Sequence, residues 1–465
     1  MSQQSPNLKL IAVFAVPLLL VTALLQASKR YVDVFEGDEN LDELVKQAKA
    51  AGYPFEASEL AVKGVPDSNN GFIPLKKYFL DKKNPLPKKT DDIQNYWELD
   101  KPTLSPEIAE LVRRAKAVGS RSQFDAKRDY DQGFALLFPE YAYLKTVGRV
   151  LAYDAAHRAR HGDDEGAIQS LRLARNSALQ LSADKPLMGV LANLACQSIF
   201  YWGVGNVAHE MRGRPASLQK LFLLVNEEIP TSEIQDSIKC EFYLLLAWMR
   251  NANPKEMLGV GGESSESDVF GLSMYDLNTS TPLVRTGLPK STVSQSLLAK
   301  AIEKFLKNEA EGASDPNKAD SESSLDRDYY TSLLRFSERF VDQIPAAYPE
   351  AARARLKPAA WREFARWAIQ IAIDHPNGYP KTLPSRKDPS MGGTLHYRKM
   401  GNYYALYSTG PDKIDNGGPW IAAGESNPDE GDDFGFSIPV KPKAPIKSTA
   451  SGVPPKSAPA TPGGI

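Results

Sequence analysis

Apolar residues recur at steps of three and four residues through most of the segment 141–213. Such spacing puts apolar side chains on one face of a helix, and the pattern is interrupted near His161 and again near Asp184. It predicts three consecutive helices, the second beginning at Asp163 or the residue after it and the third just after Asp184. The third is apolar on most faces and is expected to be the central helix. Short turns between helices of this length make them antiparallel neighbours.

Helical patterns also lie on both sides of this segment. Ser105 is the expected cap of a helix that ends at about Gly119. The residues 161–181 resemble the second half of a tetratricopeptide unit, but no second copy follows at a 34-residue period. Further helices are predicted in the segments 41–52, 231–250, 296–310, 329–340 and 360–373.

The amino terminus predicts a membrane-directed segment. The run from Leu10 to Leu25 is apolar except for Pro17 and Thr22, and its 16 residues are followed by a polar stretch. As a helix it would span roughly 24 Å, against roughly 30 Å for the hydrocarbon core of a bilayer. We favour an uncleaved membrane anchor, and the alternative is a signal peptide cleaved near Ala27, which would give a secreted form. Both readings place the bulk of the protein outside the cytoplasm, in the periplasm or at the cell surface.

Composition excludes some function classes. The chain of 465 residues carries 56 basic and 57 acidic residues, so no net field attracts nucleic acid, and no nucleic-acid partner is expected. The motifs of several common enzyme classes, among them the nucleophile elbow, the phosphate-binding loop and H-E-x-x-H, do not occur in the sequence. Cys196 and Cys240 lie in apolar helical stretches and are expected to be buried thiols, with a disulfide between neighbouring helices as the alternative.

Two sets of polar residues are candidates for metal binding or catalysis. His157 and His161 are four residues apart, on one helical face, and could contribute to a zinc site or simply form a polar helix end. Glu140, Asp154 and Glu241 are carboxylates in the helical region. A facing pair of such groups would allow a hydrolase to work in a helical groove, and their separation in space decides whether one exists.

The carboxy-terminal part of the chain changes character. Residues Leu395–Lys399 and Tyr403–Ser408 are predicted to form a hairpin around a Met400-Gly401-Asn402 turn. The stretch beyond it is rich in glycine and in hard oxygen ligands, a composition that suits calcium. Its acidic and amide side chains are Asp412, Asp415, Asn416, Asp429, Glu430, Asp432 and Asp433.

This region resembles the carboxy-terminal part of the major pseudopilin of type II secretion systems. The resemblance rests on Asp388-Pro389, on the run from Tyr404 to Asp412, and on a final Asp432-Asp433 pair. It implies a calcium site with a set of ligands carried over by position. These are backbone carbonyls of Leu406 and Ser408, the carboxylate of Asp412, and closing ligands from Asp432 or Asp433.

The amino terminus departs from the pseudopilin pattern, because "NLKLIAVFAVP" lacks the glycine cleavage site and the glutamate that follows it. The whole chain also resembles anchored envelope proteins of planctomycete-type bacteria, which implies a location and no activity. We expect a membrane-anchored extracytoplasmic protein with an interaction or structural role in the cell envelope, binding a protein partner through a helical groove. A carboxylate-dependent hydrolase and a pseudopilin-like secretion component are the alternatives.

These observations predict a mainly α fold, an irregular helical bundle or a short TPR-like array, with a small C-terminal β-hairpin and an acidic loop. The expected divisions are a membrane anchor or signal segment at 1–30, an extended linker with a short helix at 31–103, an α-helical domain at 104–375 with a flexible insert near 251–292, a small strand-loop unit at 376–438, and a disordered tail at 439–465.

Overall fold

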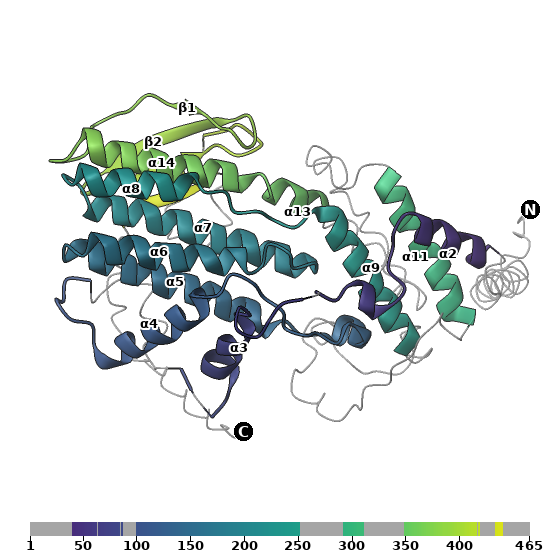
Figure 1. Ribbon diagram of the computed structural model, residues 1–465. Coiled ribbons are helices and arrows are strands. Elements are labelled where there is room, and N and C mark those ends of the chain that lie inside the picture. Colours follow the sequence, from purple (N-terminus) through teal and green to yellow (C-terminus); the bar gives the residue numbers. More distant parts are fainter. Residues whose placement is uncertain are drawn as a thin grey trace, which may run out of the picture.

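The computed structural model describes residues 40–62, 64–83, 85–86, 99–251, 292–310, 348–415, 417–418 and 433–439. The predicted anchor at 1–30, nearly all of the insert near 251–292 and all but the first residue of the tail at 439–465 lie outside these ranges. The protein is mainly helical with a small antiparallel sheet near its carboxy terminus, which confirms the predicted fold class (Figure 1).

Three long helices form the centre of the bundle. They are α5 (Pro139–Arg160), α6 (Asp164–Leu179) and α7 (Leu187–Glu210), joined by short turns as the apolar spacing predicts. Asp163 caps α6 by accepting a hydrogen bond from the backbone N–H of Gly166 at 3.0 Å. On the outside of these three, α4 (Pro106–Gly119) packs against α5 and α6, while α8 (Pro215–Asn226) and α14 (Lys357–Asp374) cover α7.

Helix α7 is apolar on all sides because neighbours enclose it. It contacts α5, α6 and α14, and one strand of the sheet also lies against it. Within the part of the chain that the structure describes, α7 is the one helix long and apolar enough to cross a membrane, and 78% of its most apolar window is buried inside the protein. A central core helix passes the same test, so the apolar composition of α7 is explained by its burial.

A second apolar cluster lies at one end of the bundle. It contains α2 (Leu41–Ala50), the 3₁₀ turns of η5 (Tyr130–Ala135), α9 (Ile234–Asn251), α11 (Thr292–Ala310) and α13 (Tyr348–Ala354) (Figure 1). Its centre is aromatic, with the ring of Phe242 at 5.0 Å from Tyr53 and 5.4 Å from Phe305, both edge-on. Val190 and Leu194 of α7 belong to this cluster, so α7 connects the two apolar cores.

The segment before α4 differs from the extended linker that its composition suggested. It forms α2, η1 (Ala57–Glu59), α3 (Phe72–Leu75) and the π-helical η2 (Lys76–Leu80). Leu75 and Phe79 are buried in the first apolar cluster, the one that fills the bundle around α5, α6 and α7, whereas Leu41 and Phe55 are buried in the second. The short helix predicted at 41–52 is present as α2. The proline- and lysine-rich composition did not indicate that a few well-placed apolar residues dock the described segment on both cores.

The sheet contains the predicted hairpin and two further strands. β2 (Thr394–Met400) and β3 (Tyr403–Ser408) pair around Gly401, whose φ of +63° suits glycine. β1 (Arg386–Lys387) and β4 (Phe434–Ile438) complete an antiparallel sheet of order β1-β2-β3-β4. The hairpin is therefore confirmed, and the end of the acidic stretch, which the sequence indicated as loop, contributes an edge strand.

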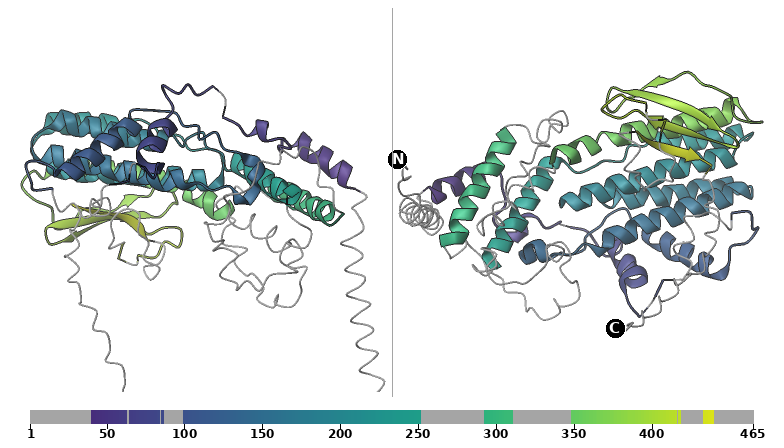
Figure 2. Two further views of the ribbon diagram at one scale, coloured as in Figure 1. Left: turned by 90° about the horizontal axis from the view of Figure 1, so that it is seen from below. Right: turned by 180° about the vertical axis from the view of Figure 1, so that it is seen from behind.

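The sheet shares the core of the bundle. Figure 2 shows it lying along the helices, and β3 and β4 contact α14 while β4 also contacts α7. Leu406, Phe436 and Ile438 are buried in the same cluster as α5 and α7. The described strands of the segment 376–438 thus share the core of the helices, where the sequence predicted a separate unit. Cys196 and Cys240 are both buried and free, as expected.

Gly205 allows the sheet to reach α7. A Cβ at this position would overlap the Cδ1 of Ile438, a fully buried side chain. Gly205→Ala should therefore lower the free energy of unfolding by about 1–3 kcal/mol, the usual cost of an overpacked core. Gly148→Ala in α5 is the matched control, since its Cβ would meet Ile199 at an ordinary 3.5 Å. A helix-favouring alanine there should add about 0.5–1 kcal/mol.

Urea unfolding of both variants measures the difference. Adding Ile438→Val to Gly205→Ala removes the overlapping methyl group and should recover part of the loss. Equal stabilities for the two alanine variants would contradict this packing between sheet and helix.

Candidate functional site

The structure places the predicted calcium ligands in two different settings. Leu406 lies in the middle of β3, paired with Tyr397 of β2 and Phe436 of β4, so its backbone belongs to the sheet ladders. The hydroxyl of Ser408 donates to the carboxylate of Asp388 and accepts from the backbone N–H of Gly410 at 3.0 Å. Both residues are buried, in agreement with a structural use of these groups.

The described acidic residues of the loop lie near its two ends in the sequence. Asp412 is exposed, and its carboxylate accepts from the backbone N–H of Ile414 at 3.0 Å, within its own turn. Asp433 is buried and accepts from the backbone N–H of Gly418 at 2.8 Å. Asp432 lies outside the described residues. Asp415 accepts from the Tyr407 hydroxyl at 3.1 Å.

Within the described ranges, no group of three or more histidine, cysteine, aspartate or glutamate side chains is arranged to hold a metal ion. These ranges include Asp412 and Asp433 but omit Asp432 and most of the loop between them. The calcium site therefore stays a prediction, and each of the two described aspartates accepts a hydrogen bond from a backbone N–H.

The histidine pair at the end of α5 holds a neighbouring loop. His157 Nε2 lies 2.8 Å from the carbonyl oxygen of Lys101, and His161 Nε2 lies 3.2 Å from that of Leu99. Burial lowers the pKa of His157, which favours the neutral ring. Each ring binds a backbone carbonyl through one nitrogen, and among the described residues no third metal-binding side chain joins the pair, which favours the polar helix end.

The three carboxylates noted in the sequence are each engaged in the fold. Asp154 is buried and binds Lys116 at 2.8 Å and Arg158 at 2.9 Å. Glu241 of α9 accepts from the backbone N–H of Leu187 at 2.9 Å and so satisfies the first turn of α7. Glu140 belongs to a buried ion cluster that the sequence analysis did not foresee.

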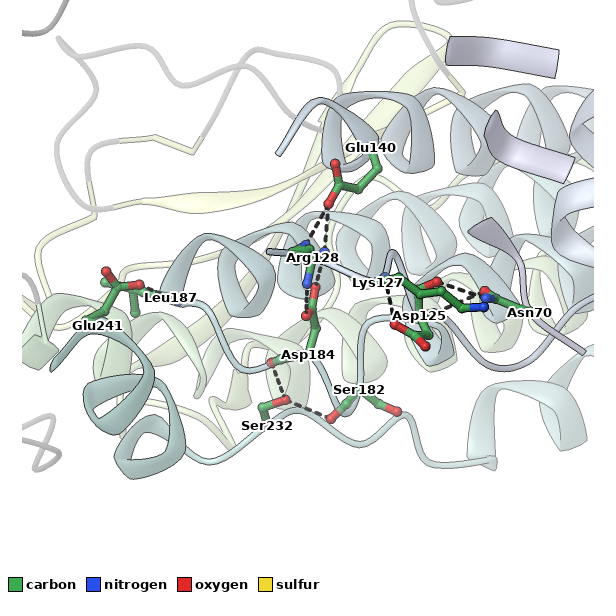
Figure 3. A network of polar contacts seen from close by, with 10 residues as sticks. All are labelled: Asn70, Asp125, Lys127, Arg128, Glu140, Ser182, Asp184, Leu187, Ser232 and Glu241. Atoms are coloured by element: carbon green, nitrogen blue, oxygen red, sulfur yellow. Dashed lines mark hydrogen bonds and ion pairs between the residues drawn. The ribbon is translucent and has the colours of Figure 1, made fainter. Parts of the chain in front are cut away.

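Arg128 is the centre of that cluster, which also contains Glu140 and Asp184 (Figure 3). Its Nε and Nη2 donate to Glu140 Oε1 at 2.9 and 2.7 Å, while Nη1 and Nη2 donate to the two oxygens of Asp184 at 2.5 and 3.0 Å. The side chains are only 5–6% exposed. This bidentate geometry is the strong form of an arginine–carboxylate pair.

Aromatic rings enclose the guanidinium. Its central carbon lies 5.2 Å from the ring of Phe138 and 5.1 Å from that of Tyr141, within cation–π range. Burial alone would lower the pKa of Arg128, but attraction to Asp184 and Glu140 outweighs burial and raises it. Burial, reinforced by the carboxylate of Asp184, raises the pKa of Tyr141. Burial also raises the pKa of Tyr130 to about 12.

The loop before α5 is folded so that Arg128 points inward. Asn70 is fully buried and binds both backbone groups of Asp125, accepting from its N–H at 3.0 Å and donating to its carbonyl at 2.8 Å. Asp125 Oδ1 in turn accepts from the backbone N–H of Lys127 at 2.8 Å, and Lys127 adopts a φ of +49°. This tight turn leaves Lys127 exposed and directs the next side chain toward α5 (Figure 3).

Asp184 has a different role from the helix start that its position suggested. Its carboxylate binds Arg128, and its backbone carbonyl accepts from the Ser232 hydroxyl at 2.7 Å. The absence of a side chain at Gly189 gives it room, because a Cβ there would lie 2.9 Å from both Asp184 Oδ2 and the Tyr141 hydroxyl. Arg128 and Asp184 are 56 positions apart, so no local spacing could have revealed their pairing.

A cavity of about 350 Å³ opens beside this ion cluster. It lies where the two apolar cores meet, since Phe124 belongs to the first cluster and Tyr130 to the second. Ligand pockets often occupy such junctions and have volumes of this order. The residues lining it are Ala61, Val62, Phe124, Asp125, Ala126, Lys127, Arg128, Tyr130 and Asp184.

Comparison with protein-family models, with curated proteins and with solved structures finds no match to this chain. Its function is therefore argued from the residues alone.

Removing the guanidinium should destabilise the fold strongly. Arg128→Met leaves Glu140 and Asp184 buried and without their cation, which should cost about 3–5 kcal/mol of unfolding free energy. Lys127→Met removes a charge of the same sign one residue away, but that side chain is 67% exposed, so its change should stay within about 0.5 kcal/mol. Urea denaturation of the two variants checks this, and similar losses in both would show that Arg128 is not a buried clamp.

The half-buried carboxyl of Glu241 should make stability depend on pH. Burial raises its pKa above the ordinary 4.5, so the folded state disfavours the ionised form. As the pH rises from about 4 to 7, the unfolded chain ionises this group freely and the folded chain loses relative stability. Glu241→Gln keeps an acceptor for Leu187 and removes the titration.

The free energy of unfolding of the wild type should therefore fall relative to Glu241→Gln over this pH range. Glu43→Gln, at an exposed position on α2, supplies the matched control. A difference between wild type and Glu241→Gln that stays constant with pH would refute the prediction.

Proposed function

We propose that this chain is a membrane-anchored helical protein of the cell envelope, with its bulk outside the cytoplasm and an interaction or structural role. The observation that carries the proposal is the apolar run from Leu10 to Leu25 at the amino terminus, followed at once by a polar segment. The described fold begins at Asn40, a short distance after this run. A folded body close to one apolar segment suits an anchored protein.

The interaction role is supported by how the body uses its charged groups. A hydrolase that works through carboxylates needs an acid that can deliver its proton to a substrate. Glu140 and Asp184 share one guanidinium, Asp154 is paired with two cations, and Glu241 caps a helix. Each of these four carboxylates therefore has a structural role. We propose on this basis that the helical body binds a protein partner rather than a substrate.

Fractionation of cells that express the full chain with a carboxy-terminal tag tests the location. The full chain should stay in the membrane fraction after alkaline carbonate extraction, and deletion of residues 1–30 should release it. Protease added to cells with a permeabilised outer layer should digest the body in the anchored protein. A full chain found in the cytoplasmic fraction would overturn the proposal.

We also propose that the acidic loop binds calcium, as its resemblance to pseudopilins implies. Support comes from the predicted hairpin and from Asp433, a buried carboxylate at the end of this glycine-rich, acidic stretch. Millimolar calcium should raise the thermal midpoint relative to a chelator. Asp433→Asn and Asp412→Ala should each reduce that rise, whereas Glu43→Gln should keep it. If the wild type does not respond to calcium, or all variants respond alike, the site does not exist.

A further inference from the structure

We infer that the cavity beside Arg128 is a binding site for a small organic cation that carries a primary ammonium group. The cavity lies at the junction of the two apolar cores. It combines apolar walls with a charged, buried floor.

The floor carries excess negative charge. Among the described residues that line the cavity or pair directly with its floor, three carboxylates face two cations: Asp125, Asp184 and Glu140 against Lys127 and Arg128. Arg128 is already bound by two carboxylates and uses four N–H donors on them. An anionic ligand would therefore meet a guanidinium whose charge is more than balanced.

Asp184 retains capacity to accept hydrogen bonds. An ionised carboxylate offers about four acceptor sites, and Arg128 occupies one on each oxygen of Asp184. Asp125 uses Oδ1 to accept from the backbone of Lys127 and is only half-buried. An ammonium group, with three donors and no acceptor, matches two carboxylates of this kind.

Lys127 is the one exposed cation among the described residues that line the cavity. Lys127 is 67% exposed, and its Nζ lies 3.8 Å from the carboxylate of Asp67, so it is drawn toward a surface acid and screened by water. The walls are formed by Phe124, Tyr130 and Val62 among others. Aromatic faces add attraction for a cation and cover its alkyl part.

A four-carbon series separates charge from shape. The probes are 1,4-diaminobutane, the neutral 1,4-butanediol and the anionic succinate, titrated calorimetrically into the full chain in nonionic detergent. The diamine should bind saturably with a Kd of about 0.1–1 mM, a plausible strength for six heavy atoms. The diol and succinate should bind at least roughly tenfold more weakly.

Variants locate the site. Asp125→Asn keeps the acceptor for the Lys127 backbone and removes only the charge, so the fold should persist while diamine affinity falls roughly ten- to hundredfold, as for one charge-assisted hydrogen bond. Ala61→Trp introduces a large side chain into the lining and should abolish binding. Lys127→Gln removes the repelling charge and should tighten binding by roughly twofold to fivefold. Glu43→Gln is the control and should leave the affinity unchanged.

The inference is overturned if the diamine shows no saturable binding with a Kd below about 10 mM. A Kd of that size corresponds to a binding free energy of under about 3 kcal/mol. It is also overturned if the diol binds as well as the diamine, or if succinate binds more tightly. Should Asp125→Asn fail to fold, the opposite charge change at Lys127 still decides the matter. Unchanged or weaker diamine binding in Lys127→Gln would then refute a cation site.

Discussion

The buried guanidinium of Arg128 joins three parts of the chain that are distant in sequence. Arg128 comes from the loop after α4, Glu140 from the first turn of α5, and Asp184 from the turn before α7. Any one of these charges alone in the interior would cost several kcal/mol, whereas together they satisfy one another. The fold can therefore close only when the starts of α5 and α7 lie side by side, with the loop between α4 and α5 wedged against them.

This clamp lies at the boundary between the two apolar cores, and it explains why a cavity persists there. The loop runs from Phe124 in one core to Tyr130 in the other, and a buried ion cluster cannot be covered by apolar side chains alone. The chain packs tightly on either side and leaves about 350 Å³ beside the charges. The hydrogen bonds that satisfy the buried charges and the cavity beside them thus both result from how the chain packs at this boundary.

The carboxy-terminal sheet is secured in a different way, through apolar packing and strand pairing. Ile438 reaches α7 where Gly205 has no side chain, and β4 pairs along β3. Asp433 and Gly418 are hydrogen-bonded at the point where the acidic stretch returns to the sheet. The backbone N–H of Gly418 and the side-chain carboxylate of Asp433 therefore join the two ends of this stretch, next to the position where the resemblance to pseudopilins implies calcium.

The sequence by itself determined the local elements. The apolar spacing located α5, α6 and α7 nearly to the residue, and the glycine turn at Gly401 located the hairpin, because helix periodicity and turn chemistry depend on neighbours in the chain. Only the tertiary structure decided that Asp184 binds Arg128, that the segment before α4 docks on both cores, and that residues 434–438 form a strand. Each of these features depends on a partner that is distant in sequence, and pairing between distant residues produces no periodic pattern in the sequence. The cavity and its charged floor, assembled from four separate stretches of chain, could not be found before those partners were in place.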